Sequence, residues 1–227
     1  MSGSLPEIDG EKIYNSSPTF NPKGELVAVH RKVHLFDIDI PGGITFKESD
    51  TLTGGDRLTL VDTGESRPGS HNATSGCPPS HSLTRLPTSL PALTLDFGKI
   101  GVGICYDIRF PELAQIAARH GAVAMIYPAA FNTTTGPLHW DLLLRSRAID
   151  NQLYTVLCSP ARATCGNGYK AYGFSAVADP MGKIIGQLDE KPAILYADVD
   201  SGAVDKARKG LPVTVQRRFD VYKDVAA

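Results

Sequence analysis

The chain has 227 residues, of which 42% are hydrophobic and 21% are charged. This composition suits a globular protein with an apolar core and excludes wholesale disorder and collagen-like sequence. The 23 Lys and Arg residues nearly balance the 24 Asp and Glu residues, so the net charge of −1 gives no electrostatic reason to expect nucleic acid or an anionic membrane as a partner.

The first residues carry no basic region followed by an apolar one, and the longest apolar run, 122–131, falls short of the about 20 residues that cross a bilayer. The four cysteines are irregularly spaced and predict neither a disulfide framework nor a zinc site. We therefore expect a cytoplasmic protein, with a mitochondrial location as the alternative.

Turn residues at 21–24 precede a strand-like run at 25–30. A hairpin is expected from 93–96 and 99–106, and its second, almost wholly apolar run suits a strand that is covered on both faces. Proline in the first turn then opens a helix that Gly121 ends. Its predicted apolar face comprises Leu113, Ile116, Ala117 and, more weakly, His120.

A buried strand is predicted at 122–127, and a second helix over 136–151 places three apolar side chains on one face: Leu138, Leu142 and Ile149. Further strands are expected at 153–158, 174–178, 183–186 and 194–199, with a hairpin turn at 179–182. Alternating strands and helices followed by a strand meander indicate an α/β protein.

The segment 64–92 differs from the rest, because 17 of its 29 residues are Ser, Thr, Pro or Gly and only three are charged. So few apolar side chains cannot offset the entropy lost on ordering, so we expect a disordered insertion. The prediction is a single domain over 1–227, interrupted by this insertion.

Cys105 stands where a buried strand turns sharply into the next element. Such a turn lifts a side chain clear of the sheet and aims backbone N–H groups at whatever the thiolate attacks. Small residues before it let other groups approach the strand closely. A buried cysteine that acts only as a small apolar residue is the competing interpretation, and position alone does not separate the two.

Lys32 lies in an apolar context, where a partly desolvated ammonium could stabilise a developing oxyanion. Taken alone, a lysine at a strand edge that reaches solvent is the simpler interpretation. Glu48 would by default be a surface carboxylate in a loop.

These segments together resemble the nitrilase, or carbon–nitrogen hydrolase, superfamily, and the ω-amidase branch in particular. The resemblance rests on segments 30–42, 44–49, 103–113, 127–132, 136–140 and 145–151 and extends over 10–60 and 94–222. It implies an α/β fold of the nitrilase type, an α-β-β-α sandwich.

The resemblance implies that Cys105 is the nucleophile, that Lys32 and the backbone N–H of Tyr106 stabilise the oxyanion, and that Glu48 positions the lysine and the substrate. Phe131 and Asn132, after a strand end, are candidates to line the substrate pocket. The implied substrate is the terminal amide of a small 2-oxo acid such as 2-oxoglutaramate. Water is the second reactant, no metal or organic cofactor is expected, and a homo-oligomer is implied by the C-terminal segment 213–222.

The family also uses another glutamate as general base, upstream of a stretch similar to 3–7. We expect this glutamate and the opening strands to be missing here, which would leave the chain poorly active and poorly folded. The alternatives are a non-catalytic family member, an amidase of another nitrilase branch, and a hydrolase with a Cys–His pair, for which no histidine lies in a recognisable motif.

Overall fold

The computed structural model describes residues 3–42, 45–63, 98–166 and 168–222. Its centre is a six-stranded sheet in the order β11-β10-β9-β8-β7-β6. The pairs β7–β8 and β8–β9 are parallel, and the outer pairs are antiparallel. The strands are β6 (Thr59–Asp62), β7 (Lys99–Val102), β8 (Ala122–Pro128), β9 (Tyr154–Cys158), β10 (Ala176–Ala178) and β11 (Ile184–Gln187).

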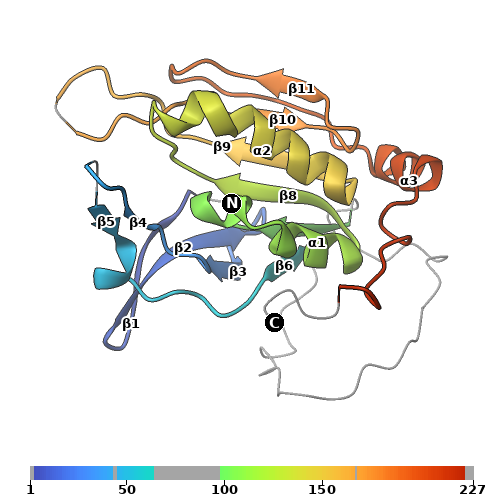
Figure 1. Ribbon diagram of the computed structural model, residues 1–227, viewed down its shortest axis with the longest axis horizontal. Helices are drawn as coiled ribbons and strands as arrows, with labels where there is room; N and C mark the ends of the chain where they lie inside the picture. The colour runs from blue at the N-terminus through green and yellow to red at the C-terminus, as the bar shows by residue number, and fades with distance from the viewer. Residues whose placement is uncertain (1–2, 43–44, 64–97, 167, 223–227) are drawn as a thin grey trace.

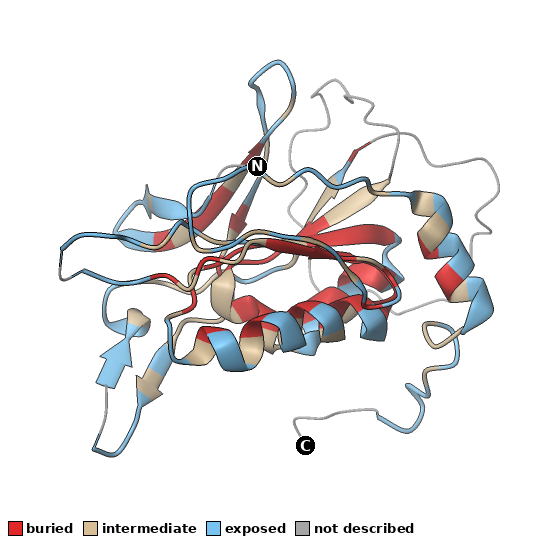
Figure 2. Cartoon of the chain, turned by 90° about the horizontal axis from the view of Figure 1, so that it is seen from above, coloured by how far each residue is buried: buried red, intermediate tan, exposed pale blue. Residues whose placement is uncertain are grey.

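Helices α1 (Pro111–Arg119) and α2 (Thr135–Asn151) lie side by side on one face of this sheet (Figure 1). They are the crossovers that join the parallel strands, which cannot be linked by a tight turn. Burial is concentrated in the sheet and on the inner sides of the helices (Figure 2). Helix α3 (Ser201–Gly210) packs on the other face through Val204, which contacts a cluster that includes Tyr154 and Val177.

A second, three-stranded antiparallel sheet is formed by β1 (Leu5–Asp9), β2 (Lys12–Phe20) and β3 (Leu26–Arg31). Strand β3 contacts β6 of the larger sheet, where Nδ1 of His30 lies 3.2 Å from Oγ1 of Thr59. The short pair β4 (Asp37–Asp39) and β5 (Thr45–Lys47) follows, and the 3₁₀ helix η1 (Glu48–Asp50) comes directly after it. Strand β3 therefore lies beside the larger sheet.

The α/β class, the turn at 21–24, and the strands and helices predicted from 25–30 and from 111–186 are confirmed, with ends that differ by one to two residues. The strand predicted at 99–106 ends at Val102, because the next turn is the 3₁₀ helix η2 (Cys105–Arg109). The strand predicted at 194–199 is wrong, since those residues join no sheet. The predictions for 64–92 and 93–96 lie outside the described residues.

The buried face of α1 is predicted in part, since Leu113 and Ala117 are buried, whereas that of α2 is predicted wrongly. In α1, Ile116 is 43% exposed, while the small residues Ala114, Ala117 and Ala118 contact the sheet. In α2, Trp140, Leu144 and Ala148 point inward, and the predicted apolar face lies on the outside, with Leu138, Leu142 and Ile149 all exposed. In α1 small side chains let the helix approach the sheet closely, which periodicity alone does not reveal.

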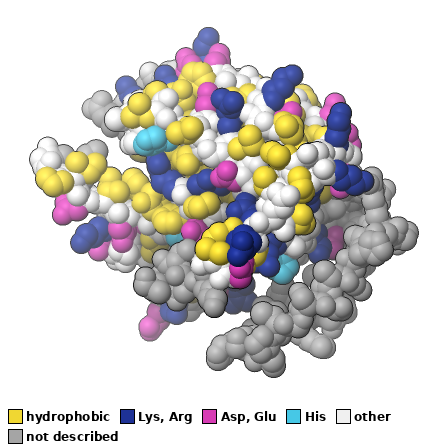
Figure 3. All heavy atoms as spheres, turned by 45° about the vertical axis from the view of Figure 1, so that its right-hand side comes forward, with side chains coloured by type: hydrophobic (Ala, Val, Ile, Leu, Met, Phe, Trp, Pro, Cys, Tyr) yellow, Lys and Arg dark blue, Asp and Glu magenta, His cyan; other side chains and the backbone are white. Residues whose placement is uncertain are grey.

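The surface carries both signs of charge, and Figure 3 shows Lys and Arg side chains interspersed with Asp and Glu on one face. This distribution agrees with the near-zero net charge. Within the described residues, no helix is both long and apolar enough to cross a membrane.

Candidate active site

Cys105 lies on a strained turn between strand β7 and the 3₁₀ helix η2. Its φ of 45° falls in the left-handed region, which residues with a side chain rarely adopt. Such a conformation costs on the order of 1–3 kcal/mol and persists only where the surrounding structure imposes it. The predicted sharp turn is confirmed.

Two glycines before the turn permit close packing beneath it. A Cβ on Gly103 would lie 2.5 Å from the ring of Tyr127, and one on Gly101 would overlap the sulfur of Met125. Both contacts are closer than atoms can approach, so neither position accepts a side chain without local rearrangement. The prediction that small residues let neighbours approach this strand is confirmed.

Lys32 follows β3 directly and is almost fully buried, at 2% exposure. Its Nζ lies 2.5 Å from Oε2 of Glu48, and the same oxygen accepts the N–H of Phe36 at 2.8 Å. The lysine backbone is held on both sides, because its N–H donates to Asn15 and its carbonyl accepts from Gly55. Lys32 and Glu48 thus form a largely buried ion pair, and the simpler interpretation that each lies at the surface is wrong.

A cavity of about 740 Å³ opens where these elements meet. Its wall includes all six residues singled out in the sequence: Lys32, Glu48, Cys105, Tyr106, Phe131 and Asn132. They come from the segments that follow β3, β5, β7 and β8, including the starts of η1 and η2, so the fold brings together residues up to 100 positions apart in the chain.

The charges around Cys105 act on its thiol in opposite directions. Burial raises the pKa of Cys105, the Lys32 ammonium lowers it and the Glu48 carboxylate raises it, with a net value above the ordinary one. The thiol also contacts the carbonyl oxygen of Ala130 at 4.0 Å. Because the Lys32 ammonium opposes the effect of burial, deprotonation of Cys105 depends on how close the thiolate lies to that ammonium.

Tyr106 and Asn132 differ in what they offer a ligand. Tyr106 lies in the first turn of η2, before the first N–H to carbonyl bond, from Asp107 to Ile104, so its own N–H precedes the helical hydrogen bonds. Oδ1 of Asn132 already accepts the N–H groups of Thr134 and Thr135 at the start of α2. Asn132 therefore shapes the wall, and its amide oxygen is occupied.

Further polar residues line the cavity and were not among the predicted ones, and Arg109 and Tyr169 are the two with ionisable side chains of note. Arg109 lies over the ring of Phe131 at 4.7 Å, and Nη1 is 3.2 Å from Nδ1 of His139. Tyr169 donates to the carbonyl oxygen of Ala130 at 2.6 Å, and burial raises its pKa to about 12. Arg109 lies four residues after Cys105, at the other end of η2, and this short spacing is the sequence feature that could have predicted its place in the cavity.

Among the residues that the structure describes, Glu48 is the one acidic side chain in the cavity wall, and no histidine contributes to it. Glu7, which the sequence left without a role, instead pairs with Arg31 on the three-stranded sheet. A Cys–His pair at this cavity therefore finds no support in the described part of the chain. In the same ranges, no three His, Cys, Asp or Glu side chains are grouped so that they could hold a metal ion.

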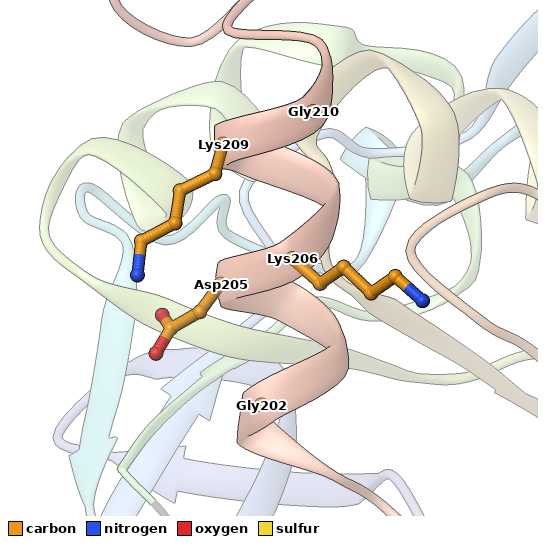
Figure 4. Close-up of a pocket in the computed structure, with 5 residues that line it drawn as sticks. All are labelled: Gly202, Asp205, Lys206, Lys209 and Gly210. Carbon is orange, nitrogen blue, oxygen red and sulfur yellow. The ribbon is translucent and has the colours of Figure 1, made fainter.

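A second hollow runs along α3 between Gly202 and Gly210. Figure 4 shows that Lys206 extends away from Asp205 and Lys209, so these side chains do not converge on a common point. It carries no arrangement comparable to the cavity at Cys105.

The family model described as carbon-nitrogen hydrolase matches residues 1–209. The omega-amidase NIT3 of Saccharomyces cerevisiae is 50% identical over the whole chain, which covers 67% of that protein. A protein of Schizosaccharomyces pombe named a hydrolase is 49% identical over 99% of the chain and 60% of its own length.

The crystal structure of Saccharomyces cerevisiae Nit3, described as a member of branch 10 of the nitrilase superfamily, matches with a TM-score of 0.73 and 46% identity. This match covers 96% of the chain and 65% of Nit3, so the chain spans between 60% and 67% of the length of these relatives. The family match, the shared fold and the Cys105 turn beside a buried lysine lead to one conclusion: the chain belongs to the carbon–nitrogen hydrolase family.

Proposed function

We propose that this chain hydrolyses the terminal amide of a small 2-oxo acid, of the 2-oxoglutaramate or 2-oxosuccinamate type, through a thioester on Cys105. The observation that carries the proposal is the shared cavity, in which a cysteine on a strained turn faces the same space as a buried lysine. The name omega-amidase of the yeast relative supports the substrate class.

The reaction proceeds in two balanced steps. The Cys105 thiolate attacks the amide carbon, the C–N bond breaks, and the amide nitrogen leaves as ammonia after it gains a proton. Water then attacks the thioester, which releases the carboxylic acid and returns the thiol. Each step passes through a tetrahedral oxyanion that needs hydrogen-bond donors.

Lys32 and the backbone N–H of Tyr106 are the proposed donors to this oxyanion. The ammonium is buried and is held by Glu48, so it is oriented before the substrate binds. A preoriented donor in a water-poor site stabilises developing charge more than it would in bulk water. Glu48 accordingly acts through the lysine as well as lining the cavity.

Arg109 supplies the charge that a 2-oxo acid would need. It lines the cavity, and within the described residues no ion pair joins its guanidinium to a carboxylate. A guanidinium binds a carboxylate through two parallel hydrogen bonds. The apolar rings of Phe36 and Phe131 provide walls for the short carbon chain between the carboxylate and the amide.

The mechanism requires a base that accepts the proton of the Cys105 thiol. Glu48 is held by Lys32, and the described part of the wall offers no second carboxylate to accept the proton. Loss of a general base typically slows a reaction about 10²–10⁴-fold. We therefore expect slow turnover that rises with pH, and a non-catalytic protein is the alternative.

The test is to mix the purified chain with 2-oxoglutaramate and to measure ammonia across a range of pH, with Cys105→Ala as the control. Ammonia release that Cys105→Ala abolishes supports the proposal. Release that is equal in both proteins, or absent at every pH, contradicts it. A panel of neutral amides, nitriles and carbamoyl compounds separates the ω-amidase activity from other nitrilase-type activities.

The proposal includes a homodimer, formed through the exposed apolar side of α2 or the segment 213–222. Leu138, Leu142 and Ile149 are each at least half exposed on that helix, and exposed apolar patches commonly mark interfaces. Sedimentation of the wild type and of Leu142→Asp measures this directly. A dimer that Leu142→Asp leaves intact would assign the interface to the C-terminal segment instead.

A cytoplasmic location is also part of the proposal. The three described cysteines, Cys105, Cys158 and Cys165, are free thiols, which suits a reducing compartment. Fractionation of cells that naturally produce the protein tests it, and recovery from mitochondria would contradict it.

A further inference from the structure

Asp107 is a fully buried carboxylate two residues after the candidate nucleophile. It does not line the cavity, so it cannot touch a substrate held there. Burying an ionised carboxylate is costly unless it is well hydrogen-bonded. The hydrogen-bond partners of Asp107 therefore show which parts of the fold it connects.

One oxygen of Asp107 holds the turn that carries Cys105. Oδ2 accepts the N–H of Ile104, the residue just before the cysteine, at 2.9 Å. The N–H of Asp107 in turn donates to the carbonyl of Ile104 at 3.0 Å. This reciprocal pair encloses Cys105 and opposes relaxation of its left-handed φ.

The other oxygen reaches the segment that carries Lys32. Oδ1 accepts the backbone N–H of His34 at 2.9 Å and Nδ1 of its ring at 2.8 Å. The ring of His34 also stacks on Phe110, with centroids 3.7 Å apart and planes 8° apart. Because His34 is two residues after Lys32, these contacts fix the lysine segment against the nucleophile turn.

Two further side chains, His30 and Arg147, hold Asp107 and the helix η2 in place. Nε2 of His30 lies 3.2 Å from Oδ2 of Asp107, and the opposite ring nitrogen contacts Thr59 of strand β6. Arg147 holds the far end of η2, where it donates to the carbonyl oxygens of Ile108 and Arg109. The turn is thus fixed at both ends, and Asp107 is the member that also bonds to His34, two residues after Lys32.

We propose that Asp107 is a positioning residue for catalysis, which sets the placement of the Cys105 thiolate relative to the Lys32 ammonium through its bonds to Ile104 and His34. This rests on the proposed function for its catalytic consequence, but the positioning itself can be measured without a substrate. A carboxylate that served only to cap η2 would not need the second oxygen to bind His34.

The experiment measures the rate at which iodoacetamide alkylates Cys105, followed on the Cys105 peptide by mass spectrometry with the exposed Cys165, which lies outside the cavity lining, as the internal reference. In Asp107→Asn, one oxygen becomes an N–H₂ group that faces an N–H donor, so the turn relaxes and the thiolate loses its placement beside the ammonium. We expect the Cys105 rate to fall about 10²-fold, the scale of a misplacement by about 1 Å. Asp141→Asn is the matched control, since that exposed carboxylate binds Gln187 on the surface.

His34 provides a second pair of variants that keeps Asp107 intact. His34→Leu removes the ring donor, and His34→Asn keeps a side-chain N–H in a similar position. We expect a rate about tenfold lower in His34→Leu, the scale of one hydrogen bond to a charged group, and recovery of most of it in His34→Asn. Such recovery is not expected if the ring only fills space against Phe110.

Melting curves accompany every variant. A folded Asp107→Asn that reacts at the wild-type rate or faster would overturn the proposal, and if that variant does not fold, equal rates in the two His34 variants and the wild type would overturn it. Where the wild type hydrolyses the amide, kcat should fall in these variants while KM stays constant, because Asp107 does not contact the cavity. Failure of the wild type to release ammonia would refute the proposed function alone, since alkylation still reports on positioning.

Discussion

Oε2 of Glu48 accepts two hydrogen bonds at once, from Nζ of Lys32 at 2.5 Å and from the backbone N–H of Phe36 at 2.8 Å. The lysine is almost entirely buried and the glutamate side chain is 17% exposed, so this ion pair has little solvent around it. Each charge depends on the other for its stability within the fold.

Breaking this pair from either side should destabilise the protein. Lys32→Met leaves a carboxylate without its cation, and Glu48→Gln leaves a buried ammonium without its anion. We expect each to lower the free energy of unfolding by about 3–5 kcal/mol, and the double variant to lose much less than the sum. Urea unfolding of the four proteins measures the coupling.

The exposed pair Asp56 and Arg57 is the control for that cycle. Its side chains are 74% and 63% exposed, and their bond should be worth about 0–1 kcal/mol. A coupling between Lys32 and Glu48 that is no larger than this would show that the buried pair contributes nothing special.

The same two residues should move the titration of Cys105 in opposite directions. Since Lys32 lowers the pKa of the thiol and Glu48 raises it, Lys32→Met should shift the pH profile of Cys105 alkylation upward and Glu48→Gln should shift it downward. In the wild type, burial holds the pKa above its ordinary value, so the rate should still be rising at alkaline pH. Profiles that shift in the same direction would contradict this account of the site.

Arg109 should determine selectivity for acidic amides. Arg109→Met removes the guanidinium while it keeps an apolar side chain beside Phe131. We expect kcat/KM for 2-oxoglutaramate to fall about 10–100-fold, the scale of hydrogen bonds to a charged group, with little change for a neutral amide of similar length. Arg57→Met is the control, because that arginine is exposed and bonds to Asp56. An equal loss for both amides would assign Arg109 a structural role.

The sequence predicts the α/β order and the Cys105 turn well, because both depend on local patterns. Strand β8 is an apolar run and α1 has proline at its start, so neither needs tertiary information to be found. The run at 194–199 has similar local character but joins no sheet, since pairing depends on a neighbouring strand that the pattern does not include.

The features that the sequence does not predict depend on partners that lie far apart in the chain. Taken alone, the sequence around Lys32 is that of an ordinary strand-edge lysine; the resemblance links it to Glu48, and the fold places that carboxylate beside it. Asp107 and His34 are 73 residues apart, and no local period links them. Likewise, Leu142 has the periodicity of a core residue, while the neighbouring Trp140 takes the buried position against Phe174.

Gly103 offers a test of the packing beneath the nucleophile. In Gly103→Ala the new methyl group would lie 2.5 Å from the ring of Tyr127, which is fully buried, so the ring or the turn must shift. We expect a loss of about 1–3 kcal/mol in stability, the usual cost of overpacking, together with slower alkylation of Cys105 as the turn shifts. Gly210→Ala is the matched control, because a methyl group there meets nothing within 4 Å. Urea unfolding and peptide-resolved alkylation of both variants decide the matter: a Gly103→Ala protein as stable and as reactive as Gly210→Ala would show that the close approach of strand β7 to Tyr127 is not needed to hold the turn.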